Sequence, residues 1–328
     1  MLNKAFVVNK TQEATFVSGI EQIEIPTIGA NEVLIKASYS SLNFKDALSS
    51  VGNPGVTRNF PHVTGIDVAG IIEESNSEDF KKGDEVLVTG YDMGMNSDGG
   101  HQSFVKVPSS WVVKKPSNIT DKEIMTYGTA GLTAGLSVNE LLNNGITPES
   151  GEILVTGATG GVGSIAVSIL SKLGFEVVAI SGKEDKIPFL KELGAKEVIL
   201  RKDFDIENKK PMGRERFAGV VDTVGGNILA ESLKVLKYDG VATCCGLTSS
   251  FALNTNVFPF ILRGARLIGI DSVECKIDKK LAVWNKLANE FSIDSLTEIT
   301  NEILLEDLPE AYQSLLDGKA VGRYVVKI

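Results

Sequence analysis

One stretch, ILVTGATGGVGS at residues 153–164, constrains the fold of this chain more than any other. An apolar strand runs straight into a turn with four glycines, and a helical run follows at once. Glycines let a backbone approach a pyrophosphate closely, and a helix N-terminus offers unpaired N–H groups and the positive end of its dipole. A tight turn that serves packing alone is the alternative. The pattern predicts a dinucleotide whose diphosphate lies on Thr159, Gly160, Gly161 and Val162.

The end of the second strand, FEVVAIS at 175–181, indicates which dinucleotide binds. NAD-specific sites usually place Asp or Glu here, and that charge would repel a 2′-phosphate. This chain has Ser181, Gly182 and Lys183 instead, a hydroxyl, a flexible backbone N–H and an ammonium group that suit a phosphate. Arg201, after the third strand, is expected to reach the same phosphate. The residues predict NADPH, unless Lys183 and Arg201 are merely solvated surface charges.

Apolar strands alternate with amphipathic helices over residues 122–298. This alternation predicts a parallel sheet covered on both faces, that is, a doubly wound α/β domain of the Rossmann type. Residues 1–121 are β-rich instead, with strands separated by Gly, Pro, Asn and Asp. The last strand, YVVKI at 324–328, has no obvious partner in the α/β part. We therefore expect it to return to the β-rich domain, which then comprises 1–121 and 299–328.

Charge and cysteine content narrow the function classes. The formal net charge is 33 − 42 = −9, whereas a nucleic-acid surface needs clustered Lys and Arg. The three cysteines, Cys244, Cys245 and Cys275, give no disulfide framework. The start of the chain does not resemble a signal peptide, and no stretch of 18 or more apolar residues occurs. We expect no nucleic-acid partner, no membrane span and a cytoplasmic location.

The order of a β-rich domain and a nucleotide domain resembles the medium-chain dehydrogenases/reductases, over essentially the whole chain. Several stretches from both domains are similar to the acrylyl-CoA reductase subgroup of the quinone-oxidoreductase-like branch. They are SLNFKDAL (41–48), RNFPHVTGID (58–67), GTAGLTA (128–134), TGATGGVGS (156–164) and PFILRGARLIGIDSV (259–273). The resemblance implies a GroES-like catalytic domain, an NADPH-dependent oxidoreductase and a homodimer.

Many members of that family bind catalytic zinc through Cys, His and Cys. Here Ile66 stands in the place of the histidine, and the segment of the first cysteine ligand reads Ser41-Leu42-Asn43-Phe44-Lys45-Asp46. Zinc needs Cys or His ligands in a defined geometry, and His62 and His101 alone cannot supply them. We expect no metal, and both histidines are expected to be ordinary loop or surface residues.

Without a metal, the chemistry that remains is hydride delivery to an already electrophilic carbon. Together with the resemblance, this chemistry favours reduction of a short enoyl-CoA such as acrylyl-CoA. Reduction of a quinone or another α,β-unsaturated carbonyl is the alternative, and a non-catalytic NADPH-binding sensor is the second alternative. All three readings imply a small-molecule ligand.

Individual site residues follow from the resemblance and from that chemistry. Asn43, or a backbone N–H near Thr129, would stabilise the enolate-like oxygen or orient the substrate. Phe44, Leu247 and Ser272 would contact the nicotinamide half of the cofactor. Arg58 and Tyr91 would line the substrate pocket. The proton donor stays open among Tyr91, Tyr127, Asp46 and water, because Phe44 stands where relatives commonly have Tyr.

Overall fold

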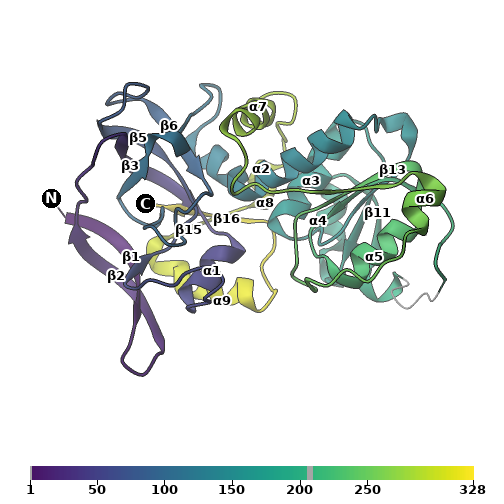
Figure 1. The fold of residues 1–328 in the computed structure, drawn as a ribbon, viewed down its shortest axis with the longest axis horizontal. Coiled ribbons are helices and arrows are strands. Elements are labelled where there is room, and N and C mark those ends of the chain that lie inside the picture. Colours follow the sequence, from purple (N-terminus) through teal and green to yellow (C-terminus); the bar gives the residue numbers. More distant parts are fainter. Residues whose placement is uncertain (1, 205–209) are drawn as a thin grey trace. The chain divides into compact units, whose positions relative to one another are not determined.

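The computed structural model describes residues 2–204 and 210–328 and divides into two compact units. The first unit comprises Met1–Thr129, Val273–Trp284 and Leu296–Ile328, and the second comprises Ala130–Ser272 and Asn285–Ser295. Figure 1 shows both units as ribbons coloured along the chain. Each unit is described by itself below.

The second unit is built on a six-stranded sheet whose strand pairs are all parallel. Its strand order is β11-β10-β9-β12-β13-β14, which is the doubly wound order 3-2-1-4-5-6. The strands are β9 (Ile153–Val155), β10 (Val177–Ser181), β11 (Ala195–Leu200), β12 (Phe217–Asp222), β13 (Leu236–Cys244) and β14 (Arg266–Gly269). The central strands β9, β10 and β12 are buried along their whole length, as a sheet covered on both faces requires.

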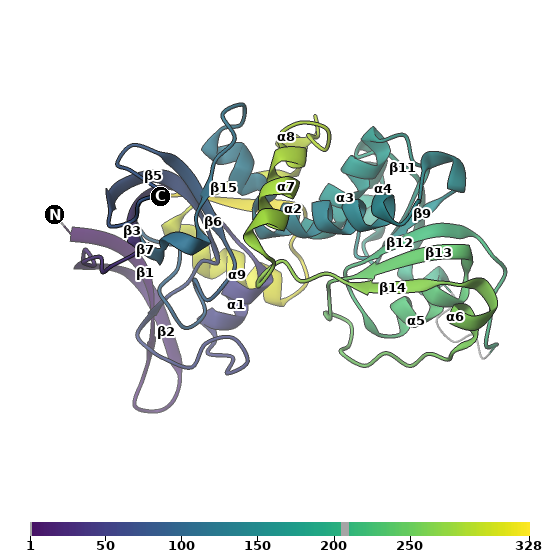
Figure 2. The ribbon, with the colours of Figure 1, turned by 45° about the horizontal axis from the view of Figure 1, so that its top comes forward.

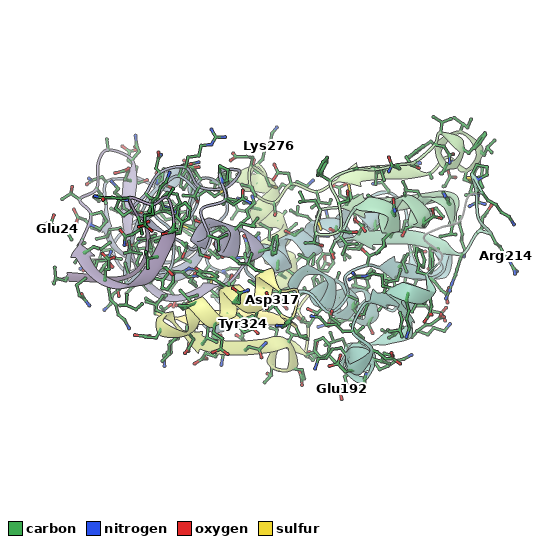
Figure 3. The ribbon with its side chains drawn as sticks, turned by 90° about the horizontal axis from the view of Figure 1, so that it is seen from below. Glu24, Glu192, Arg214, Lys276, Asp317 and Tyr324 are labelled. Carbon is green, nitrogen blue, oxygen red and sulfur yellow. The ribbon has the colours of Figure 1, made fainter. Side chains whose placement is uncertain are left out.

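Helices cover both faces of this sheet. Figure 2 shows α3 (Gly161–Lys172) and α4 (Ile187–Glu192) on one side, and α5 (Gly226–Lys234) and α6 (Phe258–Arg263) on the other. Short 3₁₀ turns lie at Pro148–Ser150, Glu184–Lys186 and Arg201–Asp203. Charged side chains such as Glu192 and Arg214 point outward (Figure 3). The expected Rossmann architecture is confirmed.

The first unit is β-rich, as the sequence predicts. A seven-stranded sheet contains β3 (Glu32–Ser41), β5 (Asp67–Ser75), β6 (Glu85–Thr89), β7 (Phe104–Pro108), β8 (Val113–Lys114), β15 (Thr300–Leu304) and β16 (Arg323–Lys327). A three-stranded sheet contains β1 (Leu2–Lys10), β2 (Phe16–Glu24) and β4 (His62–Val63). Among the described residues, three helices lie wholly in this unit, α1 (Phe44–Ser50), α8 (Leu296–Ile299) and α9 (Leu308–Leu316), and 3₁₀ turns lie at Ser109–Trp111 and Leu305–Asp307.

The C-terminal strand returns to the first unit, as expected. β16 pairs antiparallel with β3, and Val325 lies opposite Ser41. Apolar residues of β1, α1, α9 and β16 form one shared core cluster, which includes Phe6, Leu42 and Tyr312. The end of the chain therefore completes the sheet that begins near residue 32.

The unit boundaries differ from the sequence-based domain boundaries at three places, the smallest difference being that the C-terminal segment of the first unit begins at Leu296 and not at residue 299. Helix α2 (Asp121–Asn143) is interrupted at Gly128, and its first turns up to Thr129 belong to the first unit. Residues Val273–Trp284, which include most of α7 (Ile277–Leu287), also belong to the first unit. The buried Nζ of Lys280 anchors this segment, because it donates hydrogen bonds to the carbonyls of Thr89 (2.7 Å) and Val273 (3.1 Å).

In the described part of the chain, no helix is both long enough and apolar enough to cross a bilayer.

Candidate functional site

The glycine-rich turn of the second unit lies at the carboxyl end of β9 and leads into α3. Gly157 has a φ of 59°, and a Cβ on Gly163 would lie 2.4 Å from the Gly157 carbonyl oxygen. Neither position accepts a side chain, so the turn folds back tightly on itself. Gly160 precedes α3 as its N-cap without a side-chain cap, which leaves the first amides of the helix for a ligand. This cradle fits a diphosphate at Thr159, Gly160, Gly161 and Val162.

The residues expected to choose the cofactor also come together. β10 and β11 pair in parallel, with Ser181 opposite Leu200, so Gly182 and Arg201 emerge side by side. A Cβ on Gly182 would lie only 3.2–3.3 Å from the Arg201 guanidinium. The backbone N–H of Lys183 donates to Ser181 Oγ at 3.0 Å. The structure therefore places all four of these residues close together at the carboxyl end of β10: Ser181, Gly182, Lys183 and Arg201.

Electrostatics at this point favour an anionic ligand. Burial lowers the pKa of the Lys183 ammonium group, and the positive charges of Lys186 and Arg201 lower it further, whereas Asp185 opposes them. A bound phosphate would relieve the repulsion between Lys183 and Arg201. The neighbouring Glu184 forms an exposed ion pair of 3.4 Å with Lys202.

Leu247 and Ser272 follow the carboxyl ends of β13 and β14, on the same edge of the sheet. The side chain of Leu247 is 66% exposed. Ser272 is buried, and its Oγ accepts a hydrogen bond of 2.8 Å from the Thr133 hydroxyl. Ligands of open parallel sheets bind at this edge.

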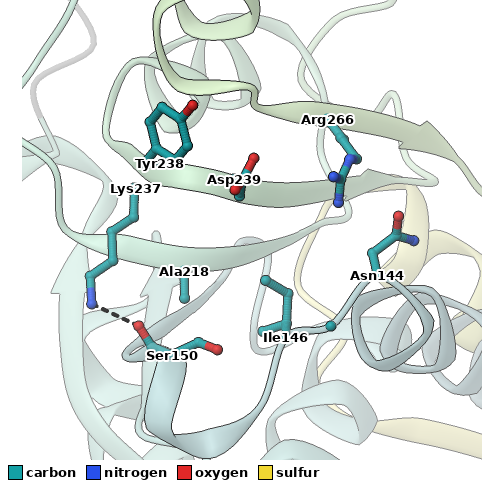
Figure 4. A pocket seen from close by; sticks show the side chains of 9 residues that line it. Asn144, Ile146, Ser150, Ala218, Lys237, Tyr238, Asp239 and Arg266 are labelled. Atoms are coloured by element: carbon teal, nitrogen blue, oxygen red, sulfur yellow. Dashed lines mark hydrogen bonds between the residues drawn. The ribbon is translucent and has the colours of Figure 1, made fainter.

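A pocket of about 440 Å³ lies at the opposite edge of the second unit, where the strands begin (Figure 4). Lys237, Asp239 and Arg266 line it, and Lys237 Nζ donates to the Ser150 carbonyl at 2.8 Å. Because the glycine turn lies at the carboxyl ends of the strands, this pocket is not the dinucleotide site.

The first unit holds a buried polar cluster, which we call the Asp67 cluster: Ser41, Asn43, Asp46, Asp67, Thr129 and Arg323. The carboxylate of Asp67 is its centre. Its Oδ2 accepts hydrogen bonds from Ser41 Oγ, from Asn43 Nδ2 (2.8 Å) and from the backbone N–H of Thr129 (2.8 Å). Its Oδ1 accepts the Thr129 hydroxyl at 2.5 Å. Four donors thus surround one fully buried carboxyl group and hold it in a single orientation.

Arg323, the first residue of β16, supplies the positive charge of this cluster. Its guanidinium donates to Ser41 Oγ (2.9 Å) and to the carbonyls of Thr126 (2.9 Å) and Leu42 (3.0 Å). Neither Asp67 nor Arg323 was predicted as a site residue from the sequence. The only available signal was a charged residue at the start of an otherwise apolar strand.

Asp46 is the second buried carboxyl group of the cluster. Its Oδ1 accepts the backbone N–H of Ile66 (2.9 Å), and its Oδ2 accepts that of Asn43 (2.7 Å). Burial, and then the charge of Asp67, raises the pKa of Asp46 to about 7, although backbone hydrogen bonds oppose the shift. The charges of Asp67 and Asp46 both act on Arg323, so a proton on Asp46 reduces the negative charge that this one buried cation has to balance.

Asn43 and Thr129 are both placed in this cluster, but their donors are already engaged. Asn43 Nδ2 and the Thr129 N–H are directed at Asp67, not at an open space. Asn43 Nδ2 also lies 3.3 Å from Ser41 Oγ, and both roles expected for Asn43, oxyanion stabilisation and orientation, stay predictions. Phe44 begins α1 with a half-exposed ring, and Arg58 Nε donates to the Pro54 carbonyl at 3.2 Å.

The Tyr91 ring is held between two partners. It stacks on Trp111 with centroids 5.5 Å apart, and Lys280 Nζ lies 3.5 Å from its centroid. Its hydroxyl faces the Cys275 carbonyl at 3.4 Å, and burial raises its pKa. These contacts fix the side chain and make it a weaker acid, which does not favour Tyr91 as the proton donor.

The strand order, the glycine turn and the phosphate-suited residues define the second unit as a dinucleotide-binding domain. Comparison with known proteins gives the same class. Residues 161–288 match the family described as zinc-binding dehydrogenase, and residues 29–117 match the alcohol dehydrogenase GroES-like domain.

Individual relatives match almost the whole chain. It is 43% identical to the putative quinone oxidoreductase YhfP of Bacillus subtilis, covering 98% of this chain and 96% of that protein. It is 38% identical to the acrylyl-CoA reductase AcuI of Ruegeria pomeroyi, covering 99% and 98%. Among solved structures, the yhdH oxidoreductase of Salmonella enterica in complex with NADP superposes with a TM-score of 0.95 at 38% identity, covering 99% of both chains. B. subtilis yhfP with NAD bound superposes with a TM-score of 0.97 at 41% identity, covering 100% of both.

The chain therefore belongs to the medium-chain dehydrogenase/reductase family, in the quinone-oxidoreductase-like branch that includes the acrylyl-CoA reductases.

The zinc in the family description does not fit the residues of this chain. Within residues 2–204 and 210–328, no group of three or more His, Cys, Asp or Glu side chains is arranged to hold a metal ion. Ile66 is a buried apolar residue, and both ring nitrogens of His101 take part in protein hydrogen bonds. The histidines were expected to be ordinary loop or surface residues. His101 does lie in a loop, but neither side chain is at the surface, since His62, in β4, is 3% exposed and His101 is 0% exposed.

Proposed function

We propose that this chain is an NADPH-dependent reductase that delivers hydride, without a metal, to the activated C=C bond of a short enoyl-CoA such as acrylyl-CoA. The observation that carries the cofactor choice is the pair of cations, Lys183 and Arg201, beside Gly182 at the end of β10. The substrate class is supported by the relative named acrylyl-CoA reductase. The relative named putative quinone oxidoreductase supports a second candidate, reduction of quinones or other α,β-unsaturated carbonyls.

In this proposal the second unit holds the dinucleotide and the first unit serves catalysis. The turn at Thr159–Val162 would bind the diphosphate, and Ser181, Gly182, Lys183 and Arg201 would bind the 2′-phosphate. Leu247, Ser272 and Phe44 would each contact the nicotinamide half. One solved relative holds NADP and another holds NAD, so the residues beside the adenosine ribose have to decide between them. No carboxylate stands at the end of β10 here, which favours NADPH.

The bound cofactor would supply hydride to the β-carbon of the substrate. Asp67 and Arg323 would fix Asn43 and Thr129, so that this end of β3 meets the substrate in one conformation. Asp46 would hold a proton near neutral pH, because its pKa is raised to about 7. It is therefore the best supported of the proton donors considered, although burial requires a relay between its carboxyl group and the substrate. Arg58 would bind an anionic group of the substrate.

Loss of NADPH absorbance with acrylyl-CoA, crotonyl-CoA and a simple quinone tests this function. We expect fast consumption with a CoA ester and little with the quinone. Turnover of quinones alone would replace the first candidate by the second. Tight NADPH binding with no turnover of any of the three would contradict both and identify a sensor.

We also propose that the protein works in the cytoplasm as a homodimer that pairs along β14. This strand is an edge of the six-stranded sheet, and α6 beside it exposes Ile261 (68%) and Leu262 (58%). An unpaired edge next to exposed apolar side chains favours a protein partner.

Light scattering tests this interface. We expect the parent to have about twice the chain mass of 35.1 kDa and Ile261→Asp to be monomeric. Val17→Asp is the matched control, because Val17 is a similarly exposed apolar residue (57%) in the first unit. A monomeric parent, or a dimer broken by Val17→Asp but not by Ile261→Asp, would contradict the proposal.

A further inference from the structure

His101, Thr64 and Tyr312 form a closed hydrogen-bonded ring inside the first unit. Thr64 Oγ1 lies 2.9 Å from His101 Nδ1 and 2.6 Å from the Tyr312 hydroxyl, and that hydroxyl lies 3.0 Å from His101 Nδ1. All three side chains are at most 3% exposed. Tyr312 lies in α9, and Thr64 and His101 lie in two separate loops. The three side chains are therefore brought together by the tertiary fold and are not part of a local turn or helix cap.

The contacts fix which ring nitrogen of His101 carries the proton. His101 Nε2 lies 3.2 Å from the backbone carbonyl oxygen of Ser41, which can only accept a hydrogen bond. Nε2 is therefore the donor, and Nδ1 must accept. Burial lowers the pKa of His101 to about 4, which keeps the ring neutral near pH 7. Either hydroxyl, that of Thr64 or that of Tyr312, can supply the proton that Nδ1 accepts.

The other end of this contact is the Asp67 cluster. Ser41 is the last residue of β3, and its Oγ bonds Asp67 and Arg323 while its carbonyl accepts the His101 N–H. The backbone of His101 is itself closely packed, because a Cβ on Gly65 would lie 2.7 Å from the His101 backbone nitrogen. His101 therefore fixes the backbone that presents Ser41 and, two residues later, Asn43.

We propose that His101 is a positioning residue of the reductase reaction: through the Ser41 carbonyl it sets the orientation of the Ser41–Asn43 turn, and Thr64 and Tyr312 are interchangeable donors that hold its tautomer. This inference rests on the proposed function, because it assigns His101 a part in that reaction.

Two substitutions of His101 distinguish the contribution of its N–H donor from that of the volume of its ring. Gln places an N–H near the position of Nε2, whereas Leu fills similar space without a donor. We expect His101→Leu to lower kcat about tenfold, the effect of one lost hydrogen bond in the transition state, with the Kd for NADPH changed less than about twofold. His101→Gln should keep about half of the parental kcat. Equal loss in both variants, or a parallel loss of NADPH affinity, would overturn the proposal.

The two hydroxyl donors provide an internal test. Thr64→Val and Tyr312→Phe should each lower kcat less than about 1.5-fold, because the remaining hydroxyl can still donate to Nδ1. The double variant should fall about tenfold, since Nδ1 then has no donor. Effects that simply multiply would contradict the interchangeable roles.

Measurements without substrate separate this proposal from the proposed function. The chain has only two histidines, so ¹⁵N-histidine spectra are assigned with His62→Gln, and His101 should be the Nε2–H tautomer. The Nδ2 resonance of Asn43 should move in His101→Leu and return in His101→Gln. If the parent reduces none of the three substrates, the proposed function fails. An unmoved Asn43 resonance or an Nδ1–H tautomer overturns the positioning role whatever the assay gives.

Discussion

Gly128 lies against the Asp67 cluster at a position that has neither the space nor the backbone conformation for a side chain. Its φ is 50°, and a Cβ there would lie 2.5 Å from Ser41 Oγ and 2.6 Å from Asp67 Oδ2. We expect Gly128→Ala to lower the free energy of unfolding by about 3 kcal/mol, from backbone strain and from the displaced cluster. Urea unfolding followed by tryptophan fluorescence measures this, since Trp111 and Trp284 both lie in the first unit.

Gly318→Ala is the matched control for backbone strain alone. Gly318 is in the same unit and has a φ of 67°, but a Cβ there would meet nothing within 4 Å. Its cost should stay near 1 kcal/mol. Equal costs at the two positions would show that the cluster does not resist the added methyl group.

The residues proposed for the dinucleotide site could be named from the sequence because they are local in it. A strand, a glycine turn and a helix follow one another, and Gly182 comes directly after a recognisable strand. The Asp67 cluster was not predictable in the same way. Asp67 and Arg323 come from opposite ends of the chain, and each alone resembles an ordinary charged residue at the start of a strand. Only the pairing of β16 with β3 brings Arg323 to Ser41.

At the level of elements, the register of β10 against β11 determines the charge beside Gly182. Lys183→Ala should weaken NADPH binding about tenfold to a hundredfold, the range for a hydrogen bond to a charged group, and change NADH binding less than about threefold. Titration of the intrinsic fluorescence of each reduced cofactor measures both constants. Lys202→Ala is the control, because Lys202 already pairs with Glu184 at the surface. Equal losses for the two cofactors would refute the 2′-phosphate assignment.

The segment Val273–Trp284 shows why element order alone did not give the unit boundaries. Its helix has the amphipathic pattern of any helix that covers a sheet, and it follows the last strand of the second unit directly. What assigns it to the first unit is a set of polar contacts with distant residues. Lys280 donates to Thr89, and the backbone N–H of Tyr91 donates to Val273 at 3.2 Å. Such contacts have no periodic signature in the sequence.

The free energy of unfolding of the first unit should depend on pH through two buried groups, Asp46 and His101, whose contributions change in opposite directions as the pH rises. The pKa of Asp46 rises from its ordinary 3.8 to about 7, so its contribution is present in acid and is lost as the pH rises through 7. The pKa of His101 falls from 6.5 to about 4, so its contribution is present above pH 6.5 and is lost as the pH falls toward 4. Between these limits the two slopes, each at most about 1.4 kcal/mol per pH unit, oppose one another in the parent protein.

When either group is removed by substitution, the pH dependence of stability that the other group causes is no longer opposed and should become measurable. Relative to the parent, Asp46→Asn should gain stability as the pH rises from 4.5 to 7, while His101→Gln should gain stability as the pH falls from 6.5 to 4.5, in the ranges that the two shifted pKa values set. Urea midpoints from tryptophan fluorescence across this range measure both differences in the same unit. Slopes of the same sign in the two variants would mean that Asp46 does not keep its proton on folding, or that His101 is not buried as the neutral ring.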